Sequence, residues 1–272
     1  MSSQTAVEES KFEMVLHSAA ELPGIRIKRD DFLRKELSKY YDNDVVEKAV
    51  KLNPAQAGIS VKNIEHIAKS CIKYETAKVT ALSAAAGIPG GLAMFGTVPA
   101  DIAQFFGHII RILQKLVYLY GWQELFRSED GLDDETTNQL TLFIGVMFGV
   151  NAANAVITKI AQSAAVKAEK TLVTKALTKG TIYPIVKKVA QAIGVKMTKD
   201  IFAKGVGKAI PIIGAAVSGG LTFATFTPMA KKLQKYLVTL PMADVNFYKQ
   251  SHENDDIIDI DFSDITDADF ET

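Results

Sequence analysis

Residues 85–99 read AAGIPGGLAMFGTVP, and residues 214–228 read GAAVSGGLTFATFTP. The two stretches align without a gap, so that the Gly-Gly-Leu of one falls on that of the other and Pro99 falls on Pro228. Both lie in uncharged segments, 79–100 and 209–230, and a third uncharged segment covers residues 136–158. Each is about as long as the roughly 20 residues that cross a bilayer. These segments predict either the apolar core of a helical protein or helices that enter membranes.

Glycines are concentrated in the two repeated stretches, and glycine allows helices to approach each other closely. We therefore predict close helix packing at five of them: Gly87, Gly90, Gly91, Gly219 and Gly220. The repetition has two interpretations. One is a true internal repeat that marks two structural halves, and this is the interpretation we favour. The other is that two small-residue helices acquired similar sequences because both pack closely. The match is too short to indicate a solenoid.

The composition indicates a chain with ample material for a core. Of its 272 residues, 48% are hydrophobic, and the formal net charge is zero. We predict one helical domain over residues 11–250, between a flexible N-terminus (1–10) and an acidic, disordered tail (251–272). Cys71 is the only cysteine, and no basic-then-apolar leader opens the sequence. Both observations suit a cytoplasmic protein in a reducing compartment.

Strand signals are scarce and helix signals are frequent, so the predicted fold class is all-α. Ser60 is a candidate N-cap for a helix that begins at residue 61. Pro99 occupies the first-turn position of a long helix that runs to residue 121. The third uncharged segment predicts a second long helix over residues 136–160.

The helix after Pro99 is apolar over most of its circumference, and its polar residues form one narrow stripe. The stripe consists of Asp101, Gln104, His108, Arg111 and Lys115. Because a helix that is hydrophobic nearly all round is buried, the stripe is either its only wet edge, which is the simpler interpretation, or the lining of an internal cavity. In the second case the first four residues would bind a polar or anionic group, and His108 would be a general base. The sequence identifies no second acid or nucleophile beside it, so we assign no catalytic residue.

Charge is strongly segregated along the chain. Residues 159–208 contain eleven lysines and two acids, whereas residues 251–272 contain nine acids and neither Lys nor Arg. The lysines either cover solvated helix faces or bind anionic lipid, and the candidate lipid contacts are Lys167, Lys170, Lys187 and Lys188. The tail either touches nothing or folds back on this basic segment. The lysine-rich segment 159–208 contains no arginine, which argues against nucleic acid as its partner. The four histidines are scattered and phosphate-loop motifs are absent, so we expect no metal and no cofactor.

Several motifs resemble the EcsC family. They are FLRKEL at 32–37, NPAQAGI at 53–59, ALSAAAGIPGGLAMFGTVPADIAQFFGHIIRILQKLVYLYGW at 81–122 and LFIGVMFGV at 142–150. The resemblance covers about residues 30–240 and implies a helical, mostly bacterial protein associated with membranes, without established catalytic residues.

We therefore expect a non-enzymatic protein that lies peripheral to a membrane, or inserts conditionally, and binds anionic lipid or a membrane protein complex. Two alternatives stay open. One is a membrane-permeabilising protein of the stress, defence or toxin type. The other is a hydrolase or lipid-modifying enzyme that uses the Asp101/His108 stripe.

Overall fold

The structure is a computed structural model that describes residues 3–86, 94–95, 98–126, 131–166, 182–196, 215–250 and 265–270. The described fold is all-α, as predicted. The longer helices are α1 (Ser3–Ala20), α2 (Arg29–Leu37), α3 (Asn43–Lys51), α4 (Val61–Ala86), α5 (Ala100–Leu119), α6 (Asp134–Phe148), α7 (Asn151–Val166), α9 (Tyr183–Lys196) and α10 (Ala215–Leu237). The short elements are η2 (Pro241–Ala243), α11 (Val245–Gln250), η3 (Asp267–Phe270) and the two-residue strands β1 (Met94–Phe95) and β2 (Val98–Pro99), which pair antiparallel. Helix α1 includes residues 3–10, for which the sequence predicted a flexible N-terminus.

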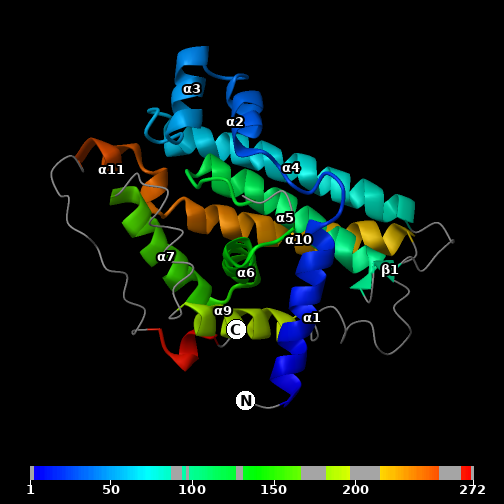
Figure 1. The fold of residues 1–272 in the computed structure, drawn as a ribbon. Coiled ribbons are helices and arrows are strands. Elements are labelled where there is room, and N and C mark those ends of the chain that lie inside the picture. The colour runs from blue at the N-terminus through cyan, green and yellow to red at the C-terminus, as the bar shows by residue number, and fades with distance from the viewer. Residues whose placement is uncertain are drawn as a thin grey trace.

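Helix α6 lies at the centre of the assembly and is seen end-on in Figure 1, where α5, α7, α9 and α10 surround and contact it. Helix α4 packs along α10 and against α5, and α1 crosses α5 and α9. At the top of Figure 1, α2 and α3 pack on each other, and α2 also packs on α5. His108 and Lys115 of the polar stripe of α5 are thus buried between neighbouring helices.

Helix α5 is buried in protein along most of its length. Between residues 106 and 119, Arg111 is the one residue outside the buried class. This burial explains why the helix is apolar nearly all round, since each side of it meets another helix. In the part of the chain that the structure describes, no helix combines the length and the hydropathy needed to cross a bilayer.

The predicted single helix over residues 136–160 is wrong, because Gly149 ends α6 and a new helix, α7, begins at Asn151. Gly149 has a φ of 80°, in the left-handed region where glycine carries no Cβ penalty. The N–H of Val150 donates to the carbonyl of Gly145 at 2.9 Å, and the N–H of Gly149 donates to that of Val146. These two bonds form a Schellman cap, which satisfies the last carbonyls of α6 and turns the chain.

The two repeated stretches do not form equivalent structures where both are described. Pro99 ends strand β2 and directly precedes α5, whereas its counterpart Pro228 lies inside α10. Met94 and Phe95 are likewise extended, while the aligned residues 223–224 are helical. The interpretation as two structural halves is therefore wrong at these positions.

The structure does not describe the surroundings of the five predicted close-packing glycines. Gly87, Gly90 and Gly91 lie outside the described residues, and Gly219 and Gly220 belong to helix α10. A close approach through glycine does occur at Gly145 in α6, where an added Cβ would lie 2.7 Å from Val189 of α9 and 2.8 Å from Ala153 of α7.

Candidate functional site

The stripe of α5 faces a single buried carboxylate, Glu75 of α4. Helix α4 places Glu75 on its inner face, and the side chain is fully buried. His108, Arg111 and Lys115 follow one another on α5 at spacings of three and four residues, so they share one side of the helix. All three turn toward Glu75, and together these four residues are called the Glu75 cluster below.

The distances within the Glu75 cluster show ion pairing by two full cations. Lys115 Nζ lies 2.7 Å from Glu75 Oε1, and Arg111 Nη2 lies 3.3 Å from the same oxygen. His108 Nδ1 lies 3.6 Å from Oε2, which is longer than a hydrogen bond. Arg111 also donates through Nη1 to the backbone carbonyl of Gly24, which ties the loop after α1 to α5.

The electrostatics of the cluster favour an ionised Glu75. Burial alone would raise the pKa of this carboxyl, but the neighbouring His108 and Lys115 and the charge of Arg111 outweigh burial, so the pKa lies well below its usual value. With one carboxylate facing both Lys115 and Arg111, the cluster carries a positive surplus. This surplus sits mostly out of water, since the side chain of Lys115 is 11% exposed and that of Arg111 is 18% exposed.

Three polar atoms of the cluster have no hydrogen-bond partner in the described part of the chain: Glu75 Oε2, His108 Nδ1 and Arg111 Nε. A proton on His108 would convert the 3.6 Å contact into a charged pair. The thiol of Cys71, one turn before Glu75 on α4, is no nucleophile at neutral pH, because burial raises its pKa to about 12. The chemistry that the cluster offers is therefore ion pairing.

The structure divides the predicted binding stripe. It brings His108 and Arg111 together at Glu75, with Lys115 beside them, while Gln104 is exposed at the surface. The side chain of Asp101 lies outside the described residues. Sequence reasoning missed Glu75, which was visible as a lone acid among the apolar and small residues of the inner face of α4.

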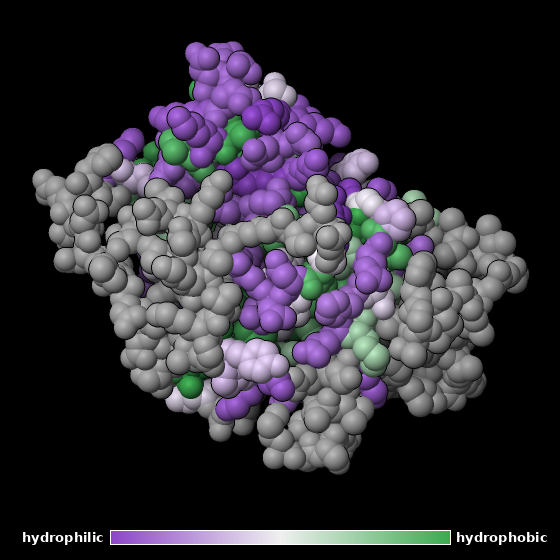
Figure 2. Space-filling model, viewed as in Figure 1, coloured by the Kyte–Doolittle hydropathy of each residue, from purple (hydrophilic) through white to green (hydrophobic). Residues whose placement is uncertain are grey.

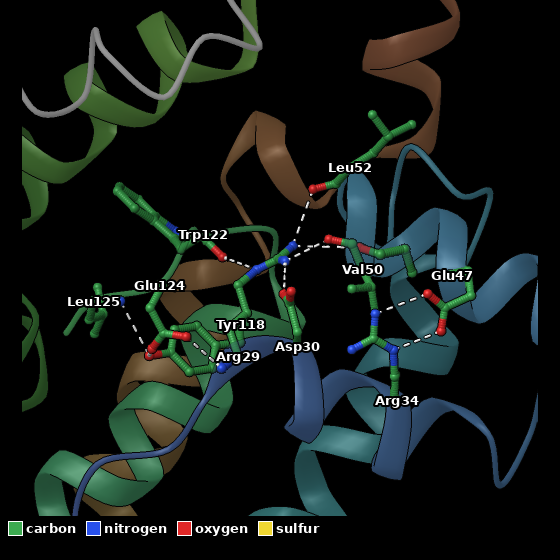
Figure 3. A network of polar contacts seen from close by, with 11 residues as sticks. Arg29, Asp30, Arg34, Glu47, Val50, Leu52, Tyr118, Trp122, Glu124 and Leu125 are labelled. Carbon is green, nitrogen blue, oxygen red and sulfur yellow. Dashed lines mark hydrogen bonds and ion pairs between the residues drawn. The ribbon is translucent and has the colours of Figure 1, made fainter. Parts of the chain in front are cut away.

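A second polar centre lies around Arg29, at the start of α2 (Figure 3). The side chain is buried, and its five N–H groups all have acceptors: the carbonyls of Ala49, Val50, Leu52 and Trp122 and the carboxylate of Asp30. Glu124 accepts from the backbone N–H of Arg29 at 2.7 Å and from the Tyr118 hydroxyl at 2.8 Å. Because no guanidinium donor remains free, this centre is structural: it joins the end of α3 to the loop after α5.

The outer faces of α4 and α10 form a third polar feature. Exposed lysines on α4 and α10 are Lys62, Lys69, Lys73, Lys78, Lys231, Lys232 and Lys235. Helix α10 contains no acid, and the two acids of α4 are the half-buried Glu65 and the fully buried Glu75. No described acid forms an ion pair with these seven side chains. Lys78 lies nine residues after Lys69, on the opposite side of α4, so the other six lysines are the ones we call the α4/α10 lysine face.

Two contacts fix how α4 and α10 lie against each other. Thr76 and Thr227 share a hydrogen bond of 3.2 Å, and Gln234 donates to the carbonyl of Glu65 at 3.3 Å. The helices are therefore antiparallel, since a later residue of one meets an earlier residue of the other. Lys69 lies seven residues before Thr76, and Lys231 lies four after Thr227, so both lysines flank the line of contact between the helices.

The α4/α10 lysine face differs from the rest of the polar surface. In Figure 2 hydrophilic residues cover much of the upper part of the molecule, where α2 and α3 lie. Both of these helices contain acids as well as bases. Arg34 and Glu47, for example, pair at 2.7 Å between α2 and α3. The α4/α10 lysine face has a single sign of charge, and the exposed ring of Tyr74 borders it.

The predicted lipid-contact lysines are only partly described. Lys187 and Lys188 lie on α9, with Lys187 Nζ 5.2 Å from the ring of Tyr183 and Lys188 Nζ 5.1 Å from the ring of Phe270. Lys167 and Lys170 lie outside the described residues. The lysines of α4 and α10 are far apart along the chain, so the sequence did not indicate that they lie on neighbouring helices.

Comparisons with protein-family models, with curated proteins and with solved structures find no match to this chain. The resemblance to the EcsC family therefore stays a prediction, and function is argued from the residues themselves.

Proposed function

We propose that this protein is a non-enzymatic, peripheral membrane protein that binds anionic phospholipid through the α4/α10 lysine face. The single observation that carries the proposal is the one-sided charge of this face. Six exposed lysines lie on two packed helices, and the one acid of these helices outside the buried interior is the half-buried Glu65. A lysine close to an anionic leaflet contributes about 1 kcal/mol, so several acting together give useful affinity.

The shape of the face supports a bilayer as its partner. Two antiparallel helices side by side present an extended row of ammonium groups rather than a pocket, and a leaflet presents an extended layer of phosphates. The Tyr74 ring, 61% exposed, stands beside the lysines, and tyrosine is favoured at the boundary between lipid and water. The resemblance to the EcsC family, which implies association with membranes, is in keeping with this function.

Binding to vesicles tests the proposal. The full-length protein is mixed with vesicles of phosphatidylcholine alone or of phosphatidylcholine with phosphatidylglycerol, and the bound fraction is measured by sedimentation. We expect binding only to the anionic vesicles, decreasing as salt is added, because exposed charges are screened beyond a Debye length of about 8 Å at physiological ionic strength.

Two variants with the same net charge test whether vesicle binding depends on the α4/α10 lysine face. The first changes four lysines of the α4/α10 lysine face: Lys69→Gln, Lys73→Gln, Lys231→Gln and Lys235→Gln. The control changes four exposed lysines around α2 and α3: Lys28→Gln, Lys35→Gln, Lys48→Gln and Lys51→Gln. The first variant should lose about 4 kcal/mol of binding free energy, or roughly a thousandfold in affinity, and the control much less.

Two results would contradict the proposal. Equal binding to neutral and anionic vesicles would remove the role of charge, and equal losses in the two variants would remove the role of this face. Release of a trapped dye from the same vesicles would favour the membrane-permeabilising alternative instead.

A further inference from the structure

The C-terminal acidic segment makes specific contacts with the helical domain. Residues 265–270 end in the short helix η3, which packs against α7 and α9. Ile265 and Phe270 are partly buried against the core, and the ring of Phe270 lies over the ammonium group of Lys188. The sequence predicted a disordered tail, and for these six residues the structure shows an ordered, docked turn.

The docked segment has its own internal order. The backbone N–H and the hydroxyl of Thr266 both donate to Asp269 Oδ2, at 2.9 and 3.0 Å, and the N–H of Asp269 donates back to the Thr266 carbonyl at 3.1 Å. This closed turn holds Ile265 and Phe270 at its two ends. The turn therefore presents an apolar residue on each side of an acidic centre.

Charge is complementary across this contact. Helix α9 contains Lys187 and Lys188 and no acid, whereas the docked segment contains Asp269 and no base. The aromatic ring of Phe270 adds a cation–π contact with Lys188 at 5.1 Å. Apolar burial and charge thus point to the same pairing of surfaces.

We propose that the face formed by α7 and α9 is a docking site for this chain's own C-terminal segment, and that an anionic membrane competes with the segment for Lys188. The docked segment is then an intramolecular latch over Lys188 of α9, which lies outside the α4/α10 lysine face. The competition, but not the docking, rests on the proposed membrane function.

The contact has the strength that a reversible latch requires. Among the described residues it partly buries two apolar side chains and includes a cation–π pair, each of which is a weak contact. The segment nevertheless belongs to the same chain as the domain, so its docking is intramolecular and acts at a high effective concentration. A weak contact within one chain stays closed in solution and opens when a surface with many negative charges approaches.

The docking is tested without membranes. A fluorescent peptide of residues 260–272 is titrated into the full-length protein, into a Phe270→Ala variant and into an Ala268→Ser control, since Ala268 is exposed in the docked turn. The Phe270→Ala protein should bind the peptide about two- to fivefold more tightly than the wild type, because its own segment no longer competes fully. The control should match the wild type, and a peptide that itself carries Phe270→Ala should bind weakly.

Equal peptide binding by the wild type and the Phe270→Ala protein would overturn the docking. The competition is tested with the same proteins and anionic vesicles, where Phe270→Ala should again bind about two- to fivefold more tightly. Unchanged vesicle binding would overturn the competition while leaving the docking site in place. If neither protein binds vesicles, the proposed membrane function fails, and the peptide titration still decides the docking.

Discussion

Replacing Glu75 with glutamine tests the account of the Glu75 cluster directly. Glutamine has nearly the same shape but no charge, so it leaves Lys115 and Arg111 without their anion in a site that is mostly closed to water. Breaking a buried ion pair by removing one partner costs about 3–5 kcal/mol, because the remaining charge is uncompensated. Since both cations are slightly exposed and the glutamine oxygen still accepts a hydrogen bond, we expect a loss near 3 kcal/mol in the free energy of unfolding.

The assay is urea denaturation of the full-length protein, with Glu47→Gln as a matched control. Glu47 also pairs with an arginine, Arg34, at 2.7 and 3.0 Å, but both side chains are nearly half exposed. Water and salt screen exposed pairs, so the control should hardly change stability. The same chemical change at two sites thus separates buried from exposed pairing.

The stability difference between the wild type and Glu75→Gln should depend on pH in a defined direction. The fold lowers the pKa of Glu75, so the unfolded chain takes up a proton at a higher pH than the folded one. The stabilisation is therefore complete above the unfolded pKa and is lost as the pH falls toward the folded pKa. We expect the full difference at pH 7 and a shrinking one below about pH 5.

Two observations would refute this reasoning. One is a Glu75→Gln variant that loses no more stability than Glu47→Gln. The other concerns the double variant Glu75→Gln with Lys115→Met, which removes a cation together with the anion and keeps an apolar chain between Phe32 and Tyr74. The double variant should recover part of the loss, and a fully additive loss would show that uncompensated charge is not the cause.

Three further predictions concern the supporting structure. Arg29→Lys leaves at most three N–H donors for acceptors that now receive five. Urea denaturation should therefore show a loss of about 2–4 kcal/mol in the free energy of unfolding, and a loss below about 1 kcal/mol would contradict the structural role of Arg29. Gly145→Ala should lower the free energy of unfolding by about 1–3 kcal/mol, because the new Cβ meets the short side chains of Val189 and Ala153. The loss should exceed that of Gly107→Ala, whose new Cβ meets the rotatable end of Ile25. Cys71, with its buried thiol of pKa about 12, should resist iodoacetamide at pH 8 in the native protein and react in urea, and rapid native labelling would show that α4 opens there.

Local signals in the sequence correctly identified much of the secondary structure. Ser60 precedes α4, and its hydroxyl accepts from the N–H of Asn63 at 3.4 Å, as expected for a cap. Pro99 stands directly before α5, and that helix is buried on nearly all sides, as its composition indicated. These features depend on residues within one or two turns of each other, which is the range that a sequence pattern records.

The helix break at Gly149 was within reach of the same reasoning. A glycine followed two residues later by asparagine is a usual end-and-start signal for consecutive helices. The continuous lack of charge over residues 136–158 concealed it, because hydropathy reports burial and not the direction of the chain.

Local patterns in the sequence were enough to predict the helical class, several helix ends and the polar stripe of α5. Tertiary structure alone decided that the stripe meets Glu75 of α4, that lysines of α4 and α10 form one face, and that Phe270 rests on Lys188. The periodicity of a helix shows which of its residues share a side. Which sides meet depends on packing between segments far apart in the chain, where many combinations bury similar apolar area and only the folded core selects one.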